Sequence, residues 1–145
     1  IAFNRSENKD LISKGVKYID LEDIFKESDI VTIHLPLTDS TRGIVNNDRL
    51  NLMKKNSILI NTARGPLVDN EALANILHEG KISGAGIDVF DMEPPLPFEY
   101  SLLKENRVIL TPHIGFATEE AMIRRAKIVF ENISGWIEGN PQNVI

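Results

Sequence analysis

Three residues with complementary chemistry each come a few positions after a short apolar segment of this sequence: Arg64, Glu93 and His113. An arginine can clamp a carboxylate and polarise the adjacent carbonyl through its planar set of donors. A histidine can exchange a proton near neutral pH, and a glutamate can orient that imidazole and stabilise its charged form. The trio suits carbonyl reduction and alcohol oxidation, with the hydride supplied by a cofactor because no side chain carries one.

The elements that must position these residues alternate along the chain. Short apolar runs bounded by turn residues predict buried strands at 1–3, 16–19, 30–35, 57–61, 86–90 and 108–111. Amphipathic stretches with capping residues predict helices at 21–26, 47–53 and 71–78. Apolar residues from Met122 to Trp136, spaced alternately by four and three positions, predict a long helix over 118–138 with a buried stripe.

This alternation indicates an α/β fold, a Rossmann-type doubly wound parallel sheet with helices on both faces. In such a sheet, ligands bind beyond the carboxyl ends of the strands. Arg64, Glu93 and His113 all follow strands, so we expect them to reach the same edge of the sheet.

Each of the three residues also has a plainer interpretation when taken alone. A single arginine after a strand is usually a surface ion-pair partner, and a single glutamate in a loop is more ordinary still. His113 follows Pro112, whose ring restricts the backbone and can aim the imidazole. The joint placement of the three favours the catalytic interpretation.

Composition excludes several classes of protein. The 145 residues are 42% hydrophobic and 26% charged, which is typical of one globular domain. The net charge of -5 and the scattered basic residues argue against a nucleic-acid partner. No apolar run approaches the roughly 20 residues that span a bilayer, and without cysteine there is no disulfide framework. We therefore expect no membrane partner and a cytoplasmic setting.

The three histidines are too far apart to form a helical metal site, and no acidic cluster accompanies them. We predict no metal. His34, at a strand end, either touches a cofactor or caps the sheet edge, whereas His78 is expected to be exposed at a helix end.

Four segments together resemble the D-isomer-specific 2-hydroxyacid dehydrogenases. They are residues 34–38 (HLPLT) with Thr41, residues 61–69 (NTARGPLVD), residues 86–90 (GIDVF) with 93–95 (EPP), and residues 111–115 (TPHIG). The resemblance runs over essentially the whole chain, in order and at natural spacings. Formate dehydrogenases of the same superfamily are less similar, because they place glutamine where Glu93 stands.

The resemblance also implies roles for individual residues. Arg64 would anchor the substrate. His113 would be the acid/base, and Glu93 would pair with it. Cofactor contacts are implied for the backbone around Leu35 and Pro36, for Thr62 and Ala63, for the Asp88 carboxylate on the nicotinamide amide, and for His113 to Gly115.

The phosphate-binding GxGxxG sequence of this family does not occur in the chain. It would lie between the first strand and first helix of the nucleotide fold, before the strand that ends at Phe3. We therefore expect residues 1–145 to be a partial dinucleotide-binding domain that lacks its first strand, with the substrate domain absent. Such a chain, tested alone, should associate, exchange segments or depend on residues outside it.

Cofactor preference is predicted from the stretch Asn4-Arg5-Ser6. NAD-preferring enzymes place an acid at the end of the second strand, and that acid repels a 2'-phosphate. Asn4 removes this charge, while Arg5 and Ser6 offer donors to a phosphate. This favours NADP over NAD, although an ordinary solvated turn would have the same composition.

The expected parent protein is an NAD(P)-dependent oxidoreductase that interconverts a 2-oxo acid and a D-2-hydroxy acid, and by resemblance a homodimer. Two alternatives remain at this stage. One is a corepressor-like protein that uses dinucleotide binding for regulation, and the other is an inert fragment.

Overall fold

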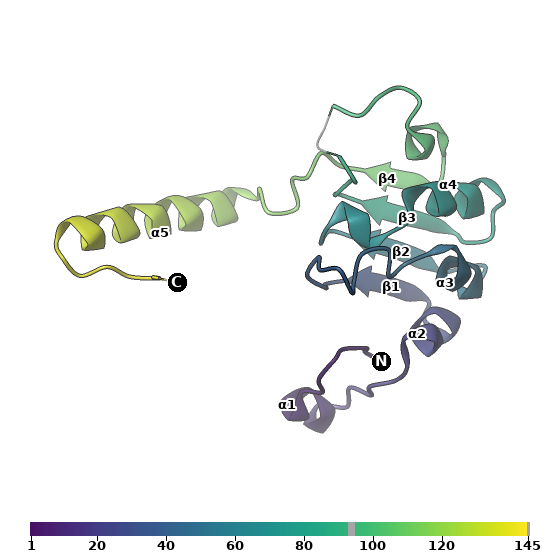
Figure 1. Ribbon diagram of the computed structural model, residues 1–145, viewed down its shortest axis with the longest axis horizontal. Helices are drawn as coiled ribbons and strands as arrows, with labels where there is room; N and C mark the ends of the chain where they lie inside the picture. The colour runs from purple at the N-terminus through teal and green to yellow at the C-terminus, as the bar shows by residue number, and fades with distance from the viewer. Residues whose placement is uncertain (93–94, 145) are drawn as a thin grey trace. The chain divides into compact units, whose positions relative to one another are not determined.

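The computed structural model describes residues 1–92 and 95–144 and contains a four-stranded parallel sheet (Figure 1). Its strands are β1 (Ile30–Ile33), β2 (Ile58–Asn61), β3 (Gly84–Ile87) and β4 (Val108–Leu110), in that spatial order. Each neighbouring pair is parallel, so the four carboxyl ends lie at one edge. The predicted α/β fold is confirmed, but β1, β3 and β4 end earlier than predicted. In particular, β3 ends at Ile87 rather than Phe90, which makes Asp88 the first residue beyond it.

Helices connect the strands at the predicted places: α2 (Leu21–Glu27), α3 (Asn47–Leu52) and α4 (Asn70–His78). The Asp69 side chain caps α4 by accepting from the Ala72 amide at 3.0 Å. Two 3₁₀ turns, η1 (Gly65–Leu67) and η2 (Ser101–Lys104), lie in the loops after β2 and β3. The sequence patterns did not predict α1 (Lys9–Ser13), because its five residues are too few to show a helical period.

One face of the sheet carries the hydrophobic core. Val31, Leu59 and Ala85 are aligned across β1, β2 and β3, and all are buried. They belong to one buried cluster with Phe25 of α2, Leu50 of α3 and Leu73 of α4. This row of helices therefore covers the face that strand alternation turns inward.

The other face of the sheet is exposed in this chain. Ile30, Ile58 and Ile109 lie on it with 62%, 37% and 74% of their surface accessible. Among the described residues of this unit, the second covering layer that we expected is therefore not seen.

The predicted strands at 1–3 and 16–19 are reduced to a single parallel bridge between Ala2 and Tyr18. The Ala2 amide donates to Lys17 O at 2.8 Å, and the Ile19 amide donates to Ala2 O at 3.0 Å. Neither segment joins the four-stranded sheet. An isolated pair of strands is marginal in water, so the ladder does not extend beyond this bridge.

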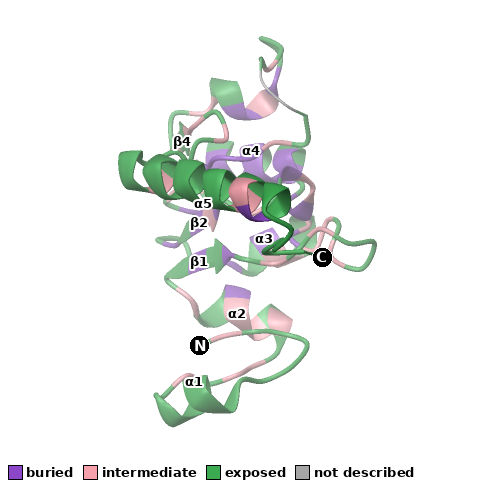
Figure 2. Cartoon of the chain, turned by 90° about the vertical axis from the view of Figure 1, so that its left-hand side faces the viewer, coloured by how far each residue is buried: buried purple, intermediate pink, exposed green. Residues whose placement is uncertain are grey.

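The chain divides into two compact units, residues 1–112 and 113–145. The second unit contains α5 (Glu119–Ile137), capped by Thr118, and thus the predicted long helix is confirmed. Its predicted buried stripe is wrong. The described helix buries only Gly135, whereas Val129 and Trp136 of the predicted stripe are 49% and 74% exposed. Figure 2 shows most of α5 in the exposed class.

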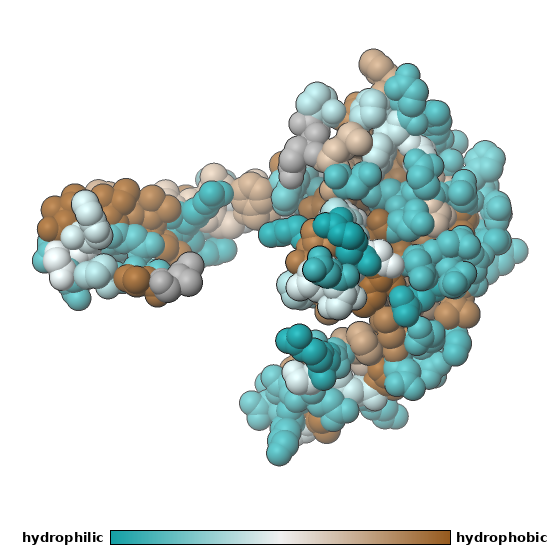
Figure 3. Space-filling model, viewed as in Figure 1, coloured by the Kyte–Doolittle hydropathy of each residue, from teal (hydrophilic) through white to brown (hydrophobic). Residues whose placement is uncertain are grey.

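The prediction of burial failed because periodicity identifies an apolar face of a helix but not the surface that covers that face. Within the second unit, the segment 139–144 turns back against the C-terminal part of α5, where the Asn143 side-chain amide donates to Asn132 Oδ1 at 2.8 Å. Figure 3 shows the apolar side chains gathered along α5. No helix in the described part of the chain is both long and apolar enough to cross a membrane.

Candidate active site

Three loops of the first unit carry predicted site residues beyond consecutive strand ends. Leu35 and Pro36 follow β1, the segment from Thr62 to Arg64 follows β2, and Asp88 follows β3. Because the strands are parallel, all three loops start from the same edge of the sheet. The fold thus brings together the ends that the sequence predicted to meet.

Asn61, the last residue of β2, organises the Arg64 loop. Its side chain is fully buried. The amide nitrogen Nδ2 donates to Arg64 O at 3.0 Å, and Oδ1 accepts from the Ala63 amide at 3.1 Å. The turn that carries Arg64 is therefore closed by one buried side chain, and the sequence motifs did not single out that residue as functional.

Arg64 itself is exposed, and its backbone is extended where η1 begins. Its Nη1 donates to Ala63 O at 2.6 Å. The guanidinium has five donors in a rigid plane, so this one contact leaves the group chemically suited to a bidentate contact with a carboxylate.

Gly65 allows the Arg64 loop to lie directly against the loop after β3. A Cβ on Gly65 would stand 1.8 Å from Phe90 O and 2.6 Å from the Asp91 amide nitrogen. No side chain fits at that distance, so only glycine permits the approach. The main chains that carry Arg64 and Asp88 are packed together as a result.

Asp88 is a buried carboxylate, with 4% of its surface accessible. The Thr111 hydroxyl, beyond the end of β4, donates to its Oδ1. A buried acid at the carboxyl edge of a parallel sheet fits the role that the family resemblance implied, accepting a hydrogen bond from a carboxamide.

The loop after β3 is anchored farther along by Tyr100. The Tyr100 hydroxyl donates to Asp91 Oδ1 at 2.6 Å, and its ring meets Phe90 edge-on, with centroids 5.9 Å apart. Burial, and then the bond to Asp91, raise the pKa of Tyr100 well above its ordinary value. Tyr100 therefore remains a hydrogen-bond donor throughout the physiological pH range.

The loop after β1 contains Leu35 and Pro36, both implied cofactor contacts. Thr41 Oγ1 donates to Pro36 O at 2.6 Å and accepts from the Thr38 amide at 2.8 Å. These bonds give the loop a defined shape, with the Pro36 carbonyl held by a side chain.

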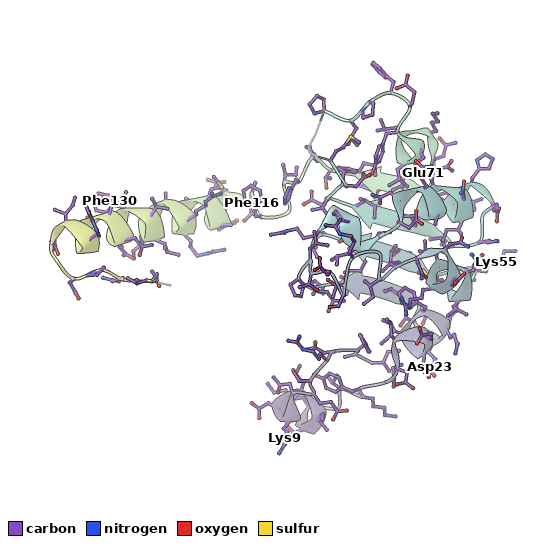
Figure 4. The ribbon with its side chains drawn as sticks, viewed as in Figure 1. Lys9, Asp23, Lys55, Glu71, Phe116 and Phe130 are labelled. Atoms are coloured by element: carbon purple, nitrogen blue, oxygen red, sulfur yellow. The ribbon has the colours of Figure 1, made fainter. Side chains whose placement is uncertain are left out.

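His113 begins the second unit and is described within that unit. Its φ of 56° lies in the left-handed region, which costs a residue with a Cβ of the order of 1 kcal/mol. Its ring meets Phe116 edge-on at 6.2 Å, and the Arg125 guanidinium of α5 lies 5.6 Å from the centre of the Phe116 ring. Figure 4 labels Phe116 in the segment that leads into α5.

A strained backbone at a histidine is a known mark of functional positions. Gly115, another predicted contact, lies in the exposed turn between His113 and α5. Glu93 lies outside the described residues, so its predicted pairing with His113 stays a prediction.

Asn4, Arg5 and Ser6 follow the Ala2 bridge and are exposed. Asn4 Oδ1 accepts from the Arg5 amide at 2.9 Å. Asn4 also lines a shallow polar pocket with Glu7, Asp20 and Asp23. Among Asn4, Arg5 and Ser6, Arg5 is the cationic side chain, and it directly follows Asn4 in the sequence. Among residues 1–92 and 95–144, no three histidine, aspartate or glutamate side chains gather as metal ligands.

Comparison with known families decides the class of protein. The family described as "D-isomer specific 2-hydroxyacid dehydrogenase, NAD binding domain" matches residues 1–115. The chain belongs to this family. The resemblance predicted from four short segments is therefore confirmed.

Individual relatives agree with this assignment. The chain is 47% identical over 125 residues to a glyoxylate reductase of Thermofilum pendens, which covers 86% of this chain and 37% of the relative. Among solved structures, a D-lactate dehydrogenase of Aquifex aeolicus with NAD and lactic acid has a TM-score of 0.84 at 32% identity, covering 95% of this chain and 46% of that one. An acyclic imino acid reductase in complex with NADPH and D-Arg has a TM-score of 0.79 at 32% identity, covering 99% and 44%.

These matches establish a Rossmann-type domain for a nicotinamide dinucleotide. The chain spans less than half the length of each of these three proteins.

Proposed function

We propose that the protein containing this chain is an NAD(P)-dependent oxidoreductase that interconverts a 2-oxo acid and a D-2-hydroxy acid. Residues 1–145 would form most of its dinucleotide-binding domain, with the substrate domain outside them. One observation carries the proposal: in a chain of this family, the loops of Arg64, Asp88 and Thr111 leave adjacent parallel strands at one edge. An inert structural role would not require a strained histidine and a buried acid after those same strands.

The residues present fit a bound nicotinamide cofactor. The buried Asp88 carboxylate, oriented by Thr111, offers an acceptor for a carboxamide. The family resemblance implies further contacts from the backbone of the Leu35–Pro36 and Thr62–Ala63 segments. The bound cofactor would supply or accept the hydride.

The side chains of the protein would bind the acid and move its proton. Arg64 would hold the substrate carboxylate, because a guanidinium binds that group with two parallel hydrogen bonds. His113 would give a proton to the carbonyl oxygen during reduction and remove it during oxidation. Glu93 would orient the imidazole.

For the cofactor we propose NADP, with NAD as the alternative. Asn4 stands where an acid would repel the 2'-phosphate, and the exposed Arg5 and Ser6 can donate to it. The neighbouring carboxylates Glu7, Asp20 and Asp23 make this region unfavourable for a phosphate, so the preference would depend on Arg5.

We further propose a cytoplasmic homodimer that binds small 2-oxo and 2-hydroxy acids and neither nucleic acid nor membranes. The net charge of -5 and the absence of cysteine support this setting. Sedimentation of the full-length protein would measure the dimer directly.

The function is tested by assaying the full-length protein with glyoxylate, hydroxypyruvate and related 2-oxo acids in the presence of NADH or NADPH. We expect turnover of at least one acid, and a loss of about 10²-fold or more in His113→Gln with cofactor binding retained. A protein that binds the dinucleotide tightly but reduces none of the acids would instead match the corepressor-like alternative.

A further inference from the structure

Asn61 is a buried polar side chain that the proposed chemistry does not use. It lies at the carboxyl end of β2, fully buried, three residues before Arg64. Buried polar groups are nearly always hydrogen-bonded, and here both ends of the amide bond to the same loop. The side chain is therefore built into the turn that carries the predicted substrate anchor.

The Asn61 amide matches the two main-chain groups that it contacts in the turn. Ala63 presents an N–H and needs an acceptor, whereas Arg64 presents a carbonyl and needs a donor. A carboxylate can meet only the first need, and an apolar side chain of similar size meets neither. The Asn61 amide satisfies both groups at once, because it carries a donor on Nδ2 and an acceptor on Oδ1.

The main chain of Asn61 also links β2 to the residue that follows β3. The Asn61 carbonyl accepts from the Asp88 amide at 3.0 Å. Gly65, on the far side of Arg64, lies against the backbone of Phe90. Arg64 is thus held between a buried hydrogen bond on its own carbonyl and a close main-chain contact at the next residue.

We propose that Asn61 is a positioning residue that aims Arg64 at the substrate carboxylate. The inference rests on the proposed function, because it takes Arg64 to be the anchor of the 2-oxo acid. Asn61 touches neither substrate nor cofactor in this role. It fixes the Arg64 carbonyl and, with it, the point at which the guanidinium leaves the loop.

Asn61→Asp separates the two bonds, because it keeps the acceptor for the Ala63 amide and removes the donor to Arg64 O. In the full-length protein we expect the KM for the 2-oxo acid to rise about tenfold, with the Kd of the cofactor unchanged.

Ser57→Ala is the matched control. Ser57 is similarly buried just before β2, and its hydroxyl donates to Lys54 O at 2.6 Å, away from the loop. It should lower the melting temperature and leave the KM unchanged.

A double-mutant cycle tests whether Asn61 acts through Arg64. In an Arg64→Ala background, Asn61→Asp should raise the KM no further. An equal rise in both backgrounds, or a lower melting temperature with an unaltered KM, would overturn the proposal and leave Asn61 a structural residue. If Asn61→Asp does not fold, Asn61→Ser, which replaces the amide with one shorter hydroxyl, takes its place in the same cycle.

A second readout does not depend on turnover. Hydrogen exchange of the peptide covering residues 62–67 should be faster in Asn61→Asp than in Ser57→Ala, relative to the unmodified protein. Equal exchange in both variants would contradict the role of Asn61, whereas an inactive parent protein would contradict only the proposed function.

Discussion

The Thr111 hydroxyl donates a hydrogen bond to Oδ1 of Asp88, joining the residues directly beyond β4 and β3. The bond crosses between two neighbouring strand ends at the edge where a dinucleotide would bind. Because Asp88 is buried, the direction of its carboxylate is set by its neighbours rather than by water.

Thr111→Val removes the hydroxyl with little change in shape. The Asp88 carboxylate then loses an orienting donor, and we expect the Kd of NAD(P)H to rise about tenfold. ADP-ribose, which lacks the nicotinamide, should bind as before. Calorimetry with both ligands provides the measurement, and Ser57→Ala, whose hydroxyl donates to Lys54 O at 2.6 Å just before β2, is the control. Equal weakening of both ligands would show that Thr111 does not act on the nicotinamide end.

Gly65→Ala should separate the loops of Arg64 and Asp88. The added Cβ would meet the backbone of Phe90 and Asp91, which cannot move as a flexible side chain would. We expect a loss of about 2 kcal/mol or more in unfolding free energy and a fall in kcat/KM. Gly86→Ala is the control, since its nearest atom is Cδ1 of Ile60 at 3.0 Å. Urea denaturation that shows equal losses for the two variants would contradict the close approach.

Tyr100 should make stability depend on pH in the alkaline range. Its pKa is raised in the folded protein, whereas an unfolded tyrosine titrates near 10. The folded state therefore holds the proton more tightly, and this contribution is complete below about pH 10 and lost as pH rises through the folded pKa. Urea denaturation of the protein and of Tyr100→Phe at about pH 8 to 11 measures it. The difference in unfolding free energy should be constant up to about pH 9.5 and shrink above about pH 10; a constant difference throughout would refute it.

Arg5→Ala tests the cofactor preference. Removing the cation should lower the ratio of kcat/KM for NADPH to that for NADH, because the carboxylates that line the pocket with Asn4 would then repel the 2'-phosphate without compensation. Kinetics with both cofactors in the full-length protein provide the ratio. Lys9→Ala, on the exposed α1, controls for the loss of any nearby positive charge. If the ratio stays the same in Arg5→Ala, then Arg5 does not read the phosphate.

The central part of the fold could be predicted because each element there has its own local signal. The apolar runs of β1 and β2, and the Asp69 cap of α4, can be recognised from neighbouring residues. The covering of α5 could not be predicted, because its apolar stripe is visible in the sequence while the surface that would cover it is not. The same limit applies to the bare face of the sheet at Ile109.

In the candidate site, the anchors were predictable and the residues that hold them were not. Arg64 and Asp88 stand in recognisable segments, but the bond from Thr111 to Asp88 joins positions 23 residues apart. Asn61 could have been found from its place in β2, because alternation with the buried Leu59 puts it on the inward face. An amide there must have partners, and the adjacent loop is where they would be sought.

The left-handed backbone of His113 costs folding free energy, whereas the proposed proton transfer needs an imidazole at this residue. Glycine adopts that conformation without a steric penalty. A laboratory evolution experiment that selected only for thermal resistance would therefore drive this codon toward glycine. One that selected for turnover would hold it at histidine, so the two selections should diverge first at this position.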